Sequence, residues 1–216
     1  MEELYKKTLD RLKAELKKQL PEIEANGDWL WHHPEAGFKE TETQKYCLEV
    51  LKNHGFEACT WPDVTGFTCT YDTGRPGPCV MIMGEMDSLI CYSHPDCNPE
   101  TGAAHACGHS IQVATAMGAF ITLTESGVLE NFGGKVMLAG VPAEKCLEIE
   151  WRTREIQKGR LHYLCGKAEL LYRGAFDGVD IVISMHAGLG NDGTITILGS
   201  HNGFISKNVT FQGRSA

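Results

Sequence analysis

The stretch CVMIMG, residues 79–84, is continuously apolar, which is typical of a central β-strand covered on both faces. Two similar runs follow it, KVMLAG at residues 135–140 and VDIVISMH at residues 179–186, and both are expected to be buried strands. Before the first run, FTCTY at residues 67–71 alternates and predicts another strand. Small and apolar residues at helical density over residues 110–125 predict a helix between the strands. This order indicates an α/β protein with a mostly parallel sheet and helices on both faces.

The N-terminal region is expected to be helical. Leucines recur at helical spacing through residues 2–20, and Pro21 is expected to stop this amphipathic helix. A second helix is expected to be capped by Thr41 or Thr43 and to end at Gly55.

The composition excludes several classes of protein. Of the 216 residues, 42% are hydrophobic and 22% are charged, as in a globular protein. A net charge of −8 argues against a nucleic-acid partner, and no apolar run is long enough to predict a membrane span. The first twenty residues alternate in charge and lack the apolar core of a signal peptide. We therefore expect a cytoplasmic protein in which most of the nine cysteines are reduced.

The segment HACGHSIQVA, residues 105–114, contains a candidate metal site. Cys107 and His109 lie two residues apart in a loop that leads into the predicted helix, so both can face one ion. Sulfur and nitrogen ligands suit zinc and related divalent metals. A buried thiol beside a surface histidine explains the same pattern equally well.

Three further polar residues follow the ends of predicted strands: Asp87, Glu144 and His186. In open α/β sheets, ligands bind at the carboxyl ends of the strands, so these side chains are expected at one edge with Cys107 and His109. Asp87 can orient a ligating imidazole, Glu144 can act as a general base and His186 can be a ligand. Taken singly, each also fits an ordinary role as a turn residue, a loop glutamate or a rim histidine.

Taken together, the motifs resemble the dinuclear metallopeptidase family that includes aminoacylases and carboxypeptidase G-type enzymes. The most similar branch is that of amidohydrolases acting on N-acyl amino acids, such as hippurate, auxin-conjugate and aminobenzoyl-glutamate hydrolases. The matching segments occur in family order: HHPEAGFKET (32–41), GEMDSL (84–89), GAAHACGH (102–109), VPAEK (141–145), SMHAG (184–188) and VTFQGRSA (209–216).

The resemblance implies a three-layer α/β/α, zinc-peptidase-like catalytic domain over residues 1–203. An inserted lid and dimerisation domain is expected to begin with its first strand at residues 204–216. It also implies a divalent metal, zinc or manganese, and a small N-acyl amino acid or dipeptide-like substrate. Full-length relatives are expected to be homodimers. The implied metal ligands are Cys107, which can bridge two ions, His109 and His186, with Glu144 as the catalytic base and Asp87 as the residue that orients the site.

Two features depart from the family pattern. Lys145 occupies the position of a glutamate ligand, and an ammonium group repels metal ions. The chain also stops at GRSA, before the family's lid histidine and its last ligand histidine, so we expect the N-terminal half of such an enzyme.

The resulting expectation is an amidohydrolase that cleaves amide bonds next to a free carboxylate, with impaired activity in this chain. The alternative is a non-catalytic fragment or pseudoenzyme that binds at most one metal ion. A redox or metal-storage protein is a third alternative, which the unpaired spacing of the cysteines disfavours.

Overall fold

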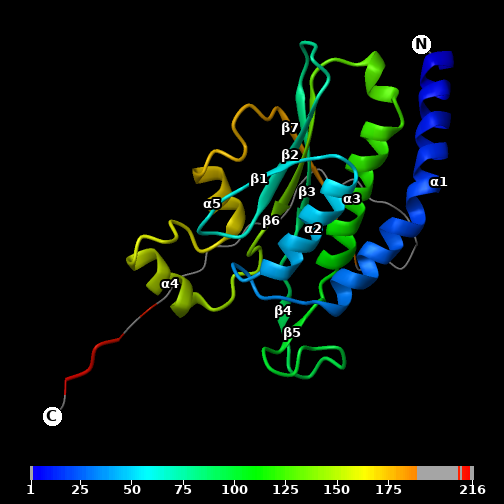
Figure 1. The fold of residues 1–216 in the computed structure, drawn as a ribbon. Helices are drawn as coiled ribbons and strands as arrows, with labels where there is room; N and C mark the ends of the chain where they lie inside the picture. Colours follow the sequence, from blue (N-terminus) through cyan, green and yellow to red (C-terminus); the bar gives the residue numbers. More distant parts are fainter. Residues whose placement is uncertain (1, 189–208, 210, 215–216) are drawn as a thin grey trace.

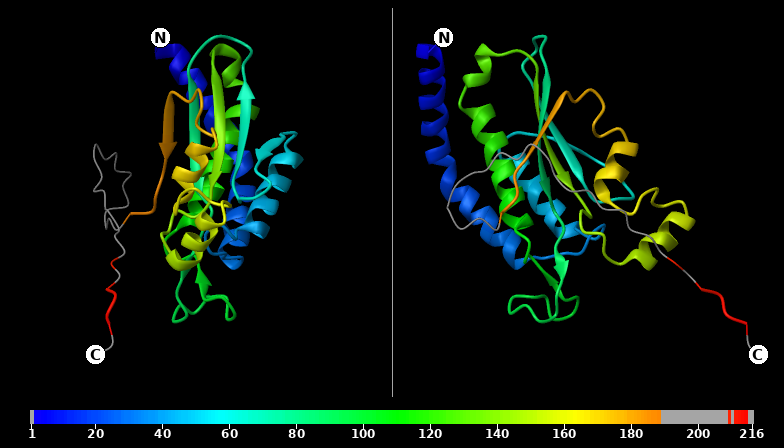
Figure 2. Two further views of the ribbon diagram at one scale, coloured as in Figure 1. Left: turned by 90° about the vertical axis from the view of Figure 1, so that its left-hand side faces the viewer. Right: turned by 180° about the vertical axis from the view of Figure 1, so that it is seen from behind.

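A central sheet separates two layers of helices. The computed structural model describes residues 2–188, 209 and 211–214. In Figure 1 the helices α1, α2 and α3 lie on one side of the sheet, while α5 lies on the other, and Figure 2 shows the same layers from two other directions. The helices have these bounds: α1 Glu2–His32, α2 Thr41–Asn53, α3 His109–Glu125, α4 Ile149–Gln157 and α5 Gly166–Tyr172, with a 3₁₀ turn at Val128–Asn131. The three-layer α/β/α architecture is therefore present.

The main sheet is mixed, with the strand order β1-β2-β6-β3-β7. These strands are β1 Ala58–Thr60, β2 Phe67–Asp72, β3 Cys79–Glu85, β6 Lys135–Val141 and β7 Ile181–Ser184, while β4 Leu89–Ile90 pairs separately with β5 Ala103–Ala104. Strand β3 is parallel to both β6 and β7, but β2 is antiparallel to β6 and to β1. Four of the five strands thus point in the same direction and β2 is reversed, so the sheet is mixed with a parallel part formed by β6, β3 and β7. The alternating pattern of β2 was the sign of its antiparallel pairing, because fully buried parallel strands are continuously apolar.

The core lies on both faces of the sheet. One cluster, between the sheet and α1, α2 and α3, contains Leu30, Phe67 and Phe120, while Met81 and Leu170 belong to a second cluster on the other face. The strand predicted from residues 79–84 is therefore covered on both sides, as expected.

Helix α1 runs through Pro21 instead of stopping there. Proline removes one intrahelical hydrogen bond and costs about 3 kcal/mol in a helix interior. The ribbon changes direction in the middle of α1, which accommodates the ring (Figure 1). The segment after Pro21 packs on α3, where Ile23 lies against Gly118 and Gly27 faces Ala114. This tertiary packing outweighs the local cost, and the predicted end of the helix was wrong.

The predicted leucine stripe does not form the buried face of α1. Leu16 and Leu20 remain 44% and 46% exposed, whereas Glu15 and Gln19 are buried. The Gln19 amide donates to the carboxylates of Glu15 and of Glu125 on α3. Hydrogen bonding across α1 and α3 therefore selects a polar strip as the inner face here.

Helix α2 is capped from a distance by Glu35. Its carboxylate accepts the backbone N–H groups of Thr41, Glu42 and Thr43 at 3.1, 3.2 and 2.8 Å. The expectation of a threonine cap was wrong, because a carboxylate from the preceding loop satisfies the free N–H groups of the first turn. The helix ends at Asn53, and Gly55 follows with a φ of +80°.

Strand β7 lies at the edge of the sheet and is not buried as expected. The side chains of Ile181, Val182 and Ile183 are 51%, 44% and 54% exposed. In the part of the chain that the structure describes, β7 pairs only with β3. The strand was correctly located, but an apolar run cannot reveal which of its faces will find a partner.

The expected division into a catalytic domain and a lid stays a prediction. Most of residues 204–216 lie outside the described part of the chain, and positions 209 and 211–214 have no regular secondary structure. Among the described residues, no helix has the combination of length and apolar character that crossing a membrane requires.

Candidate metal centre

The predicted site residues converge because three parallel strands end together. Glu85 of β3 is in register with Val141 of β6, and Met83 is in register with Ser184 of β7. The loops after these strands therefore carry Asp87, Glu144 and His186 to one edge. Helix α3 starts at the same edge and packs closely on β3. A side chain at Gly84 of β3 would meet the backbone of Val113 of α3.

Cys107, His109 and His186 lie together at this edge. Their ligand atoms are all within 4.8 Å of one another, and Cys107 Sγ lies 3.5 Å from His186 Nε2. Ligand atoms around a tetrahedral zinc ion are separated by about 3.3–3.8 Å. The imidazole planes of His109 and His186 are nearly perpendicular, at 89°. The separation of Cys107 and His186 therefore matches that of two zinc ligands, and His109 lies close enough to belong to the same cluster.

Asp87 fixes the orientation of His109. The Nδ1 of His109 donates to the backbone oxygen of Asp87 at 2.8 Å and to its carboxylate Oδ1 at 3.1 Å. Because both partners are acceptors, Nδ1 carries the proton and Nε2 faces the cluster. The other carboxylate oxygen of Asp87 accepts the backbone N–H of Lys145 at 2.8 Å. One buried carboxylate therefore positions the imidazole and the loop that carries Glu144.

The Nε2 atom of His109 is buried and has no hydrogen-bond partner. The Oε2 atom of Glu144 lies 3.8 Å away and is ion-paired with Lys145, and Glu85 Oε2 lies 3.1 Å from the same nitrogen. Burial opposes protonation of His109, but Asp87 and Glu85 outweigh it and raise its pKa to about 10. The surroundings therefore favour positive charge at this nitrogen. The donor set and the buried Nε2 of His109 fit a divalent cation.

Lys145 occupies the edge of this cluster as an ammonium group. Its Nζ lies 2.9 Å from Glu144 Oε2, and it also contacts the Cys107 thiol. Burial would lower the pKa of Lys145, but Glu144 and Cys107 raise it above the usual range. A lysine held in this charged form has no lone pair for a metal.

The structure adds two residues that the sequence analysis did not select, Glu85 and Lys167. Glu85 is 4% exposed, and its Oε1 is paired with the Lys167 ammonium of α5. Burial raises the pKa of Glu85, but His109 and Lys167 outweigh it and lower the pKa to about 2. A carboxylate at the end of an apolar strand is the signal that could have identified Glu85. Lys167 had no such signal, because it lies on a different helix 82 residues away.

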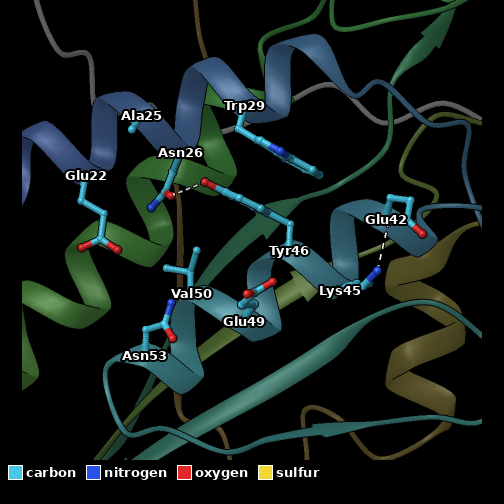
Figure 3. A pocket seen from close by; sticks show the side chains of 10 residues that line it. All are labelled: Glu22, Ala25, Asn26, Trp29, Glu42, Lys45, Tyr46, Glu49, Val50 and Asn53. Atoms are coloured by element: carbon cyan, nitrogen blue, oxygen red, sulfur yellow. Dashed lines mark hydrogen bonds and ion pairs between the residues drawn. The ribbon is translucent and has the colours of Figure 1, made fainter.

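A separate hollow of about 530 Å³ lies between α1 and α2. Trp29 and Tyr46 stack in its wall at 3.8 Å, and the Tyr46 hydroxyl donates to Asn26 (Figure 3). None of the strand-end residues lines it. The candidate chemistry therefore lies outside this hollow, at the strand ends.

Comparison with known proteins shows related hydrolases. No protein-family model matches the chain. It is 27% identical over 183 residues to an N-acyl-L-amino acid amidohydrolase of Geobacillus stearothermophilus, a match that covers 81% of this chain and 44% of the relative. It is 31% identical over 152 residues to one of the polypeptides of the p-aminobenzoyl-glutamate hydrolase of Escherichia coli, covering 64% of this chain and 30% of the relative.

A solved structure supports the fold. A dinuclear metal-binding peptidase of the M20 family from Bacillus subtilis superposes with a TM-score of 0.62 at 24% identity, covering 82% of this chain and 44% of the other. The chain thus spans less than half the length of these two curated relatives and of this solved structure.

Proposed function

The homologues of this chain are amidohydrolases of the M20 peptidase family, and from this premise we propose that the cluster of Cys107, His109 and His186 is the metal centre of such an enzyme. The observation that carries the proposal is the buried, unpartnered Nε2 of His109 beside Cys107 and His186. We assign these three residues as metal ligands. A thiolate and two imidazoles suit zinc, and the nearby carboxylates also allow manganese.

Glu144 is the proposed general base. When bound, a divalent metal supplies a Lewis acid for the scissile carbonyl and acidifies water. Glu144 follows β6 and its Oε2 faces the same nitrogen of His109, so this atom can take a proton from water and pass it to the leaving amine. Asp87 does not touch the substrate in this scheme, and it positions His109 and the loop of Glu144.

The proposed reaction is hydrolysis of an amide bond next to a free carboxylate. The support is the chemistry named for the relatives, which act on N-acyl amino acids and on aminobenzoyl-glutamate. The substrate class is therefore a small N-acyl amino acid or dipeptide-like molecule.

A second candidate function is non-catalytic metal binding. It is favoured by Lys145, whose ammonium already pairs with the proposed base at 2.9 Å. A base held in an ion pair is a weaker proton acceptor, and the same charge disfavours a second metal ion.

A metal-supplemented assay separates the two candidates. Residues 1–216 are incubated with zinc, manganese or cobalt and with N-acetyl, N-benzoyl or aminobenzoyl amino acids, and Glu144→Gln serves as the control. Turnover that disappears in Glu144→Gln establishes the hydrolase. Absence of turnover in every arm would favour the non-catalytic candidate, and because of Lys145 we expect in either case at most one metal ion bound per chain by elemental analysis. Two bound equivalents would contradict the proposed effect of Lys145.

A further inference from the structure

Two cysteines that have no part in the proposed metal centre lie next to each other, Cys146 and Cys165. Their thiols are in hydrogen-bonding contact, although helix α4 lies between them in the sequence. Both cysteines are free and half-buried, so a small molecule can reach them from solvent. The pair is therefore a candidate site for thiol chemistry.

The backbone holds these two cysteines close together. The N–H of Gly166, which directly follows Cys165, donates to the carbonyl of Ala143 at 3.1 Å. Gly166 also packs so closely on Pro142 that a side chain at this position would overlap the Pro142 carbonyl. The loop after β6 and the start of α5 are thus fixed against each other, and the contact of the thiols does not depend on side-chain rotamers alone.

A tight turn and a buried arginine add to this arrangement. The N–H of Leu147 donates to the carbonyl of Lys145 at 2.8 Å, so Cys146 is the middle residue of a three-residue turn. Arg152 of α4 is fully buried, and its Nη1 donates at 2.6 Å to the carbonyl of Leu164, next to the second cysteine. Both ends of the segment that contains α4 therefore meet at the two thiols.

Cys59 and Cys69 provide a contrast within the same chain. They lie on the paired strands β1 and β2, where Ala58 is in register with Cys69, and Cys59 with Thr68. Successive residues of a strand point to opposite faces of the sheet, and accordingly Cys59 is exposed while Cys69 is buried. Two thiols on opposite faces cannot be bridged without moving the backbone.

We propose that Cys146 and Cys165 are a modification site, at which a peroxide converts the two thiols into a reversible disulfide. A disulfide forms readily only where the backbone already holds both cysteines at bonding distance, and the contacts of Gly166 with Ala143 and Pro142 supply this condition. Both thiols are free in the structure, which is therefore the reduced state. Neither cysteine has a role in the proposed hydrolysis.

The chemistry has two steps. Burial raises the pKa of Cys165 to about 11, and the neighbouring Cys146 adds to this effect, so Cys165 keeps its proton at neutral pH. The thiolate of Cys146 attacks one peroxide oxygen, the O–O bond breaks, and the departing hydroxide takes up the proton that Cys146 released. The sulfur of Cys165 then attacks the sulfenic acid on Cys146, the S–O bond breaks, and the hydroxide leaves as water with the proton of Cys165. Two sulfurs together lose two electrons, and one peroxide becomes two waters.

The disulfide joins two elements that carry lysines of the strand-end edge. Lys145, directly before the first cysteine, pairs with Glu144, and Lys167, two residues after the second, pairs with Glu85. Oxidation therefore restrains the loop that carries Glu144 against α5.

The test uses the 216-residue chain, first reduced and then treated with one equivalent of hydrogen peroxide without added metal. Trypsin cleaves after lysine and arginine, so the two cysteines lie on separate peptides, residues 146–152 and 161–167. We expect mass spectrometry to find these peptides joined, lighter by two hydrogen atoms than their sum, and separated again by dithiothreitol. Unreacted thiols, sulfinic acids without the joined peptides, or a link to Cys107 instead would overturn the proposal.

Matched variants assign the order of attack. Cys165→Ser should leave a sulfenic acid on Cys146 that dimedone traps, and Cys146→Ser should leave Cys165 unreacted. Cys59→Ser is the control, and it should keep the joined peptides. A dimedone adduct on Cys165 in the Cys146→Ser variant would overturn the assigned order. The peptide map of the wild-type chain decides the pairing even if a variant does not fold.

Hydrogen exchange measures the effect on the loop. Backbone amides of residues 142–148 should exchange about tenfold more slowly in the oxidised chain, because the disulfide opposes local opening. The same peroxide treatment should leave exchange unchanged in Cys146→Ser. Joined peptides with unchanged exchange in the wild-type chain would overturn the restraint of the loop. None of these outcomes bears on the metal centre, because neither cysteine is among its proposed ligands.

Discussion

Glu40 is a fully buried carboxyl group with unusual protonation. Its two oxygens accept the hydroxyl of Thr65 at 2.5 Å and the backbone N–H of Ala143 at 2.7 Å. Burial outweighs these hydrogen bonds, and together with the negative charge of Asp87 it raises the pKa of Glu40 to about 8. The carboxyl group is therefore protonated in the folded protein at pH values where the unfolded chain has lost that proton.

We predict that Glu40 makes the protein less stable as the pH rises from 4.5 to about 8. In this interval the folded state holds a proton that the unfolded state releases, so the free energy of unfolding falls with pH. At about 1.4 kcal/mol per pKa unit, the loss is of the order of 5 kcal/mol. Glu40→Gln should flatten the profile measured by urea unfolding. The exposed neighbour Glu42→Gln is the control, and an unchanged slope in Glu40→Gln would refute the assignment.

Lys145 limits metal binding through its charge. Lys145→Glu exchanges a repulsive ammonium for a carboxylate ligand, and we expect the affinity for zinc or manganese to rise about tenfold or more. Lys145→Met removes only the charge and should give a smaller increase. Isothermal titration calorimetry measures both, and equal affinities in wild type and Lys145→Glu would count against the role of Lys145.

The meeting of the candidate site residues could be predicted from the sequence, because three of them follow parallel strands and two precede a helix. Their roles as ligands and base remain proposals. The ion pair between Lys145 and Glu144 and the proximity of Glu85 to His109 could not be predicted. Such contacts depend on side-chain directions within a crowded edge, which neither periodicity nor spacing encodes.

At the scale of elements, His54 connects three helices. It follows α2, and its ring nitrogens lie 2.9 Å from Glu22 of α1 and 2.5 Å from Glu125 of α3. Burial would lower the pKa of His54, but the two carboxylates outweigh it and raise the pKa. The imidazolium form thus stabilises the contact between these helices.

We predict that this contribution is complete at acidic pH, below the ordinary histidine pKa of 6.5, and is lost as the pH rises through the raised pKa of His54. His54→Gln should lower the free energy of unfolding by about 1 to 3 kcal/mol at pH 5.5 and by less at pH 9. Chemical unfolding at the two pH values measures this, with the exposed His32→Gln as control. A loss that is the same at both pH values would show that the charge of His54 is not involved.

Several elements could be predicted because one local signal determines each of them. The continuous apolar runs identified β3 and β6, the alternation identified β2, and dense small residues identified α3. The end of α1 could not be predicted, because packing of Ile23 on α3 overrides the local cost of Pro21. The exposure of β7 depends on which strands meet, and that is decided by the whole sheet.

At the scale of the whole molecule, β7 is an apolar edge of the sheet in the described part of the chain, and such an edge favours self-association. Exposed edge strands with apolar side chains offer both free backbone groups and hydrophobic surface. We predict concentration-dependent oligomers in light scattering, which the double substitution Ile181→Lys and Ile183→Lys should reduce toward monomer. Leu171→Lys, at an exposed leucine of α5, is the control for added charge. A wild-type chain that stays monomeric at all concentrations would contradict this prediction.

The contact between α1 and α3 also sets an order of events during synthesis of the chain. The hydrogen bond from Gln19 to Glu125 joins residues that are 106 positions apart. A ribosome adds roughly 5–20 residues per second, so α1 emerges about 5–20 s before the helix that covers it. The central strand β6 emerges later still, and the antiparallel partner β2 must wait for it. The nascent chain therefore carries an uncovered helix and an unpaired strand until β6, which ends at Val141, has been translated.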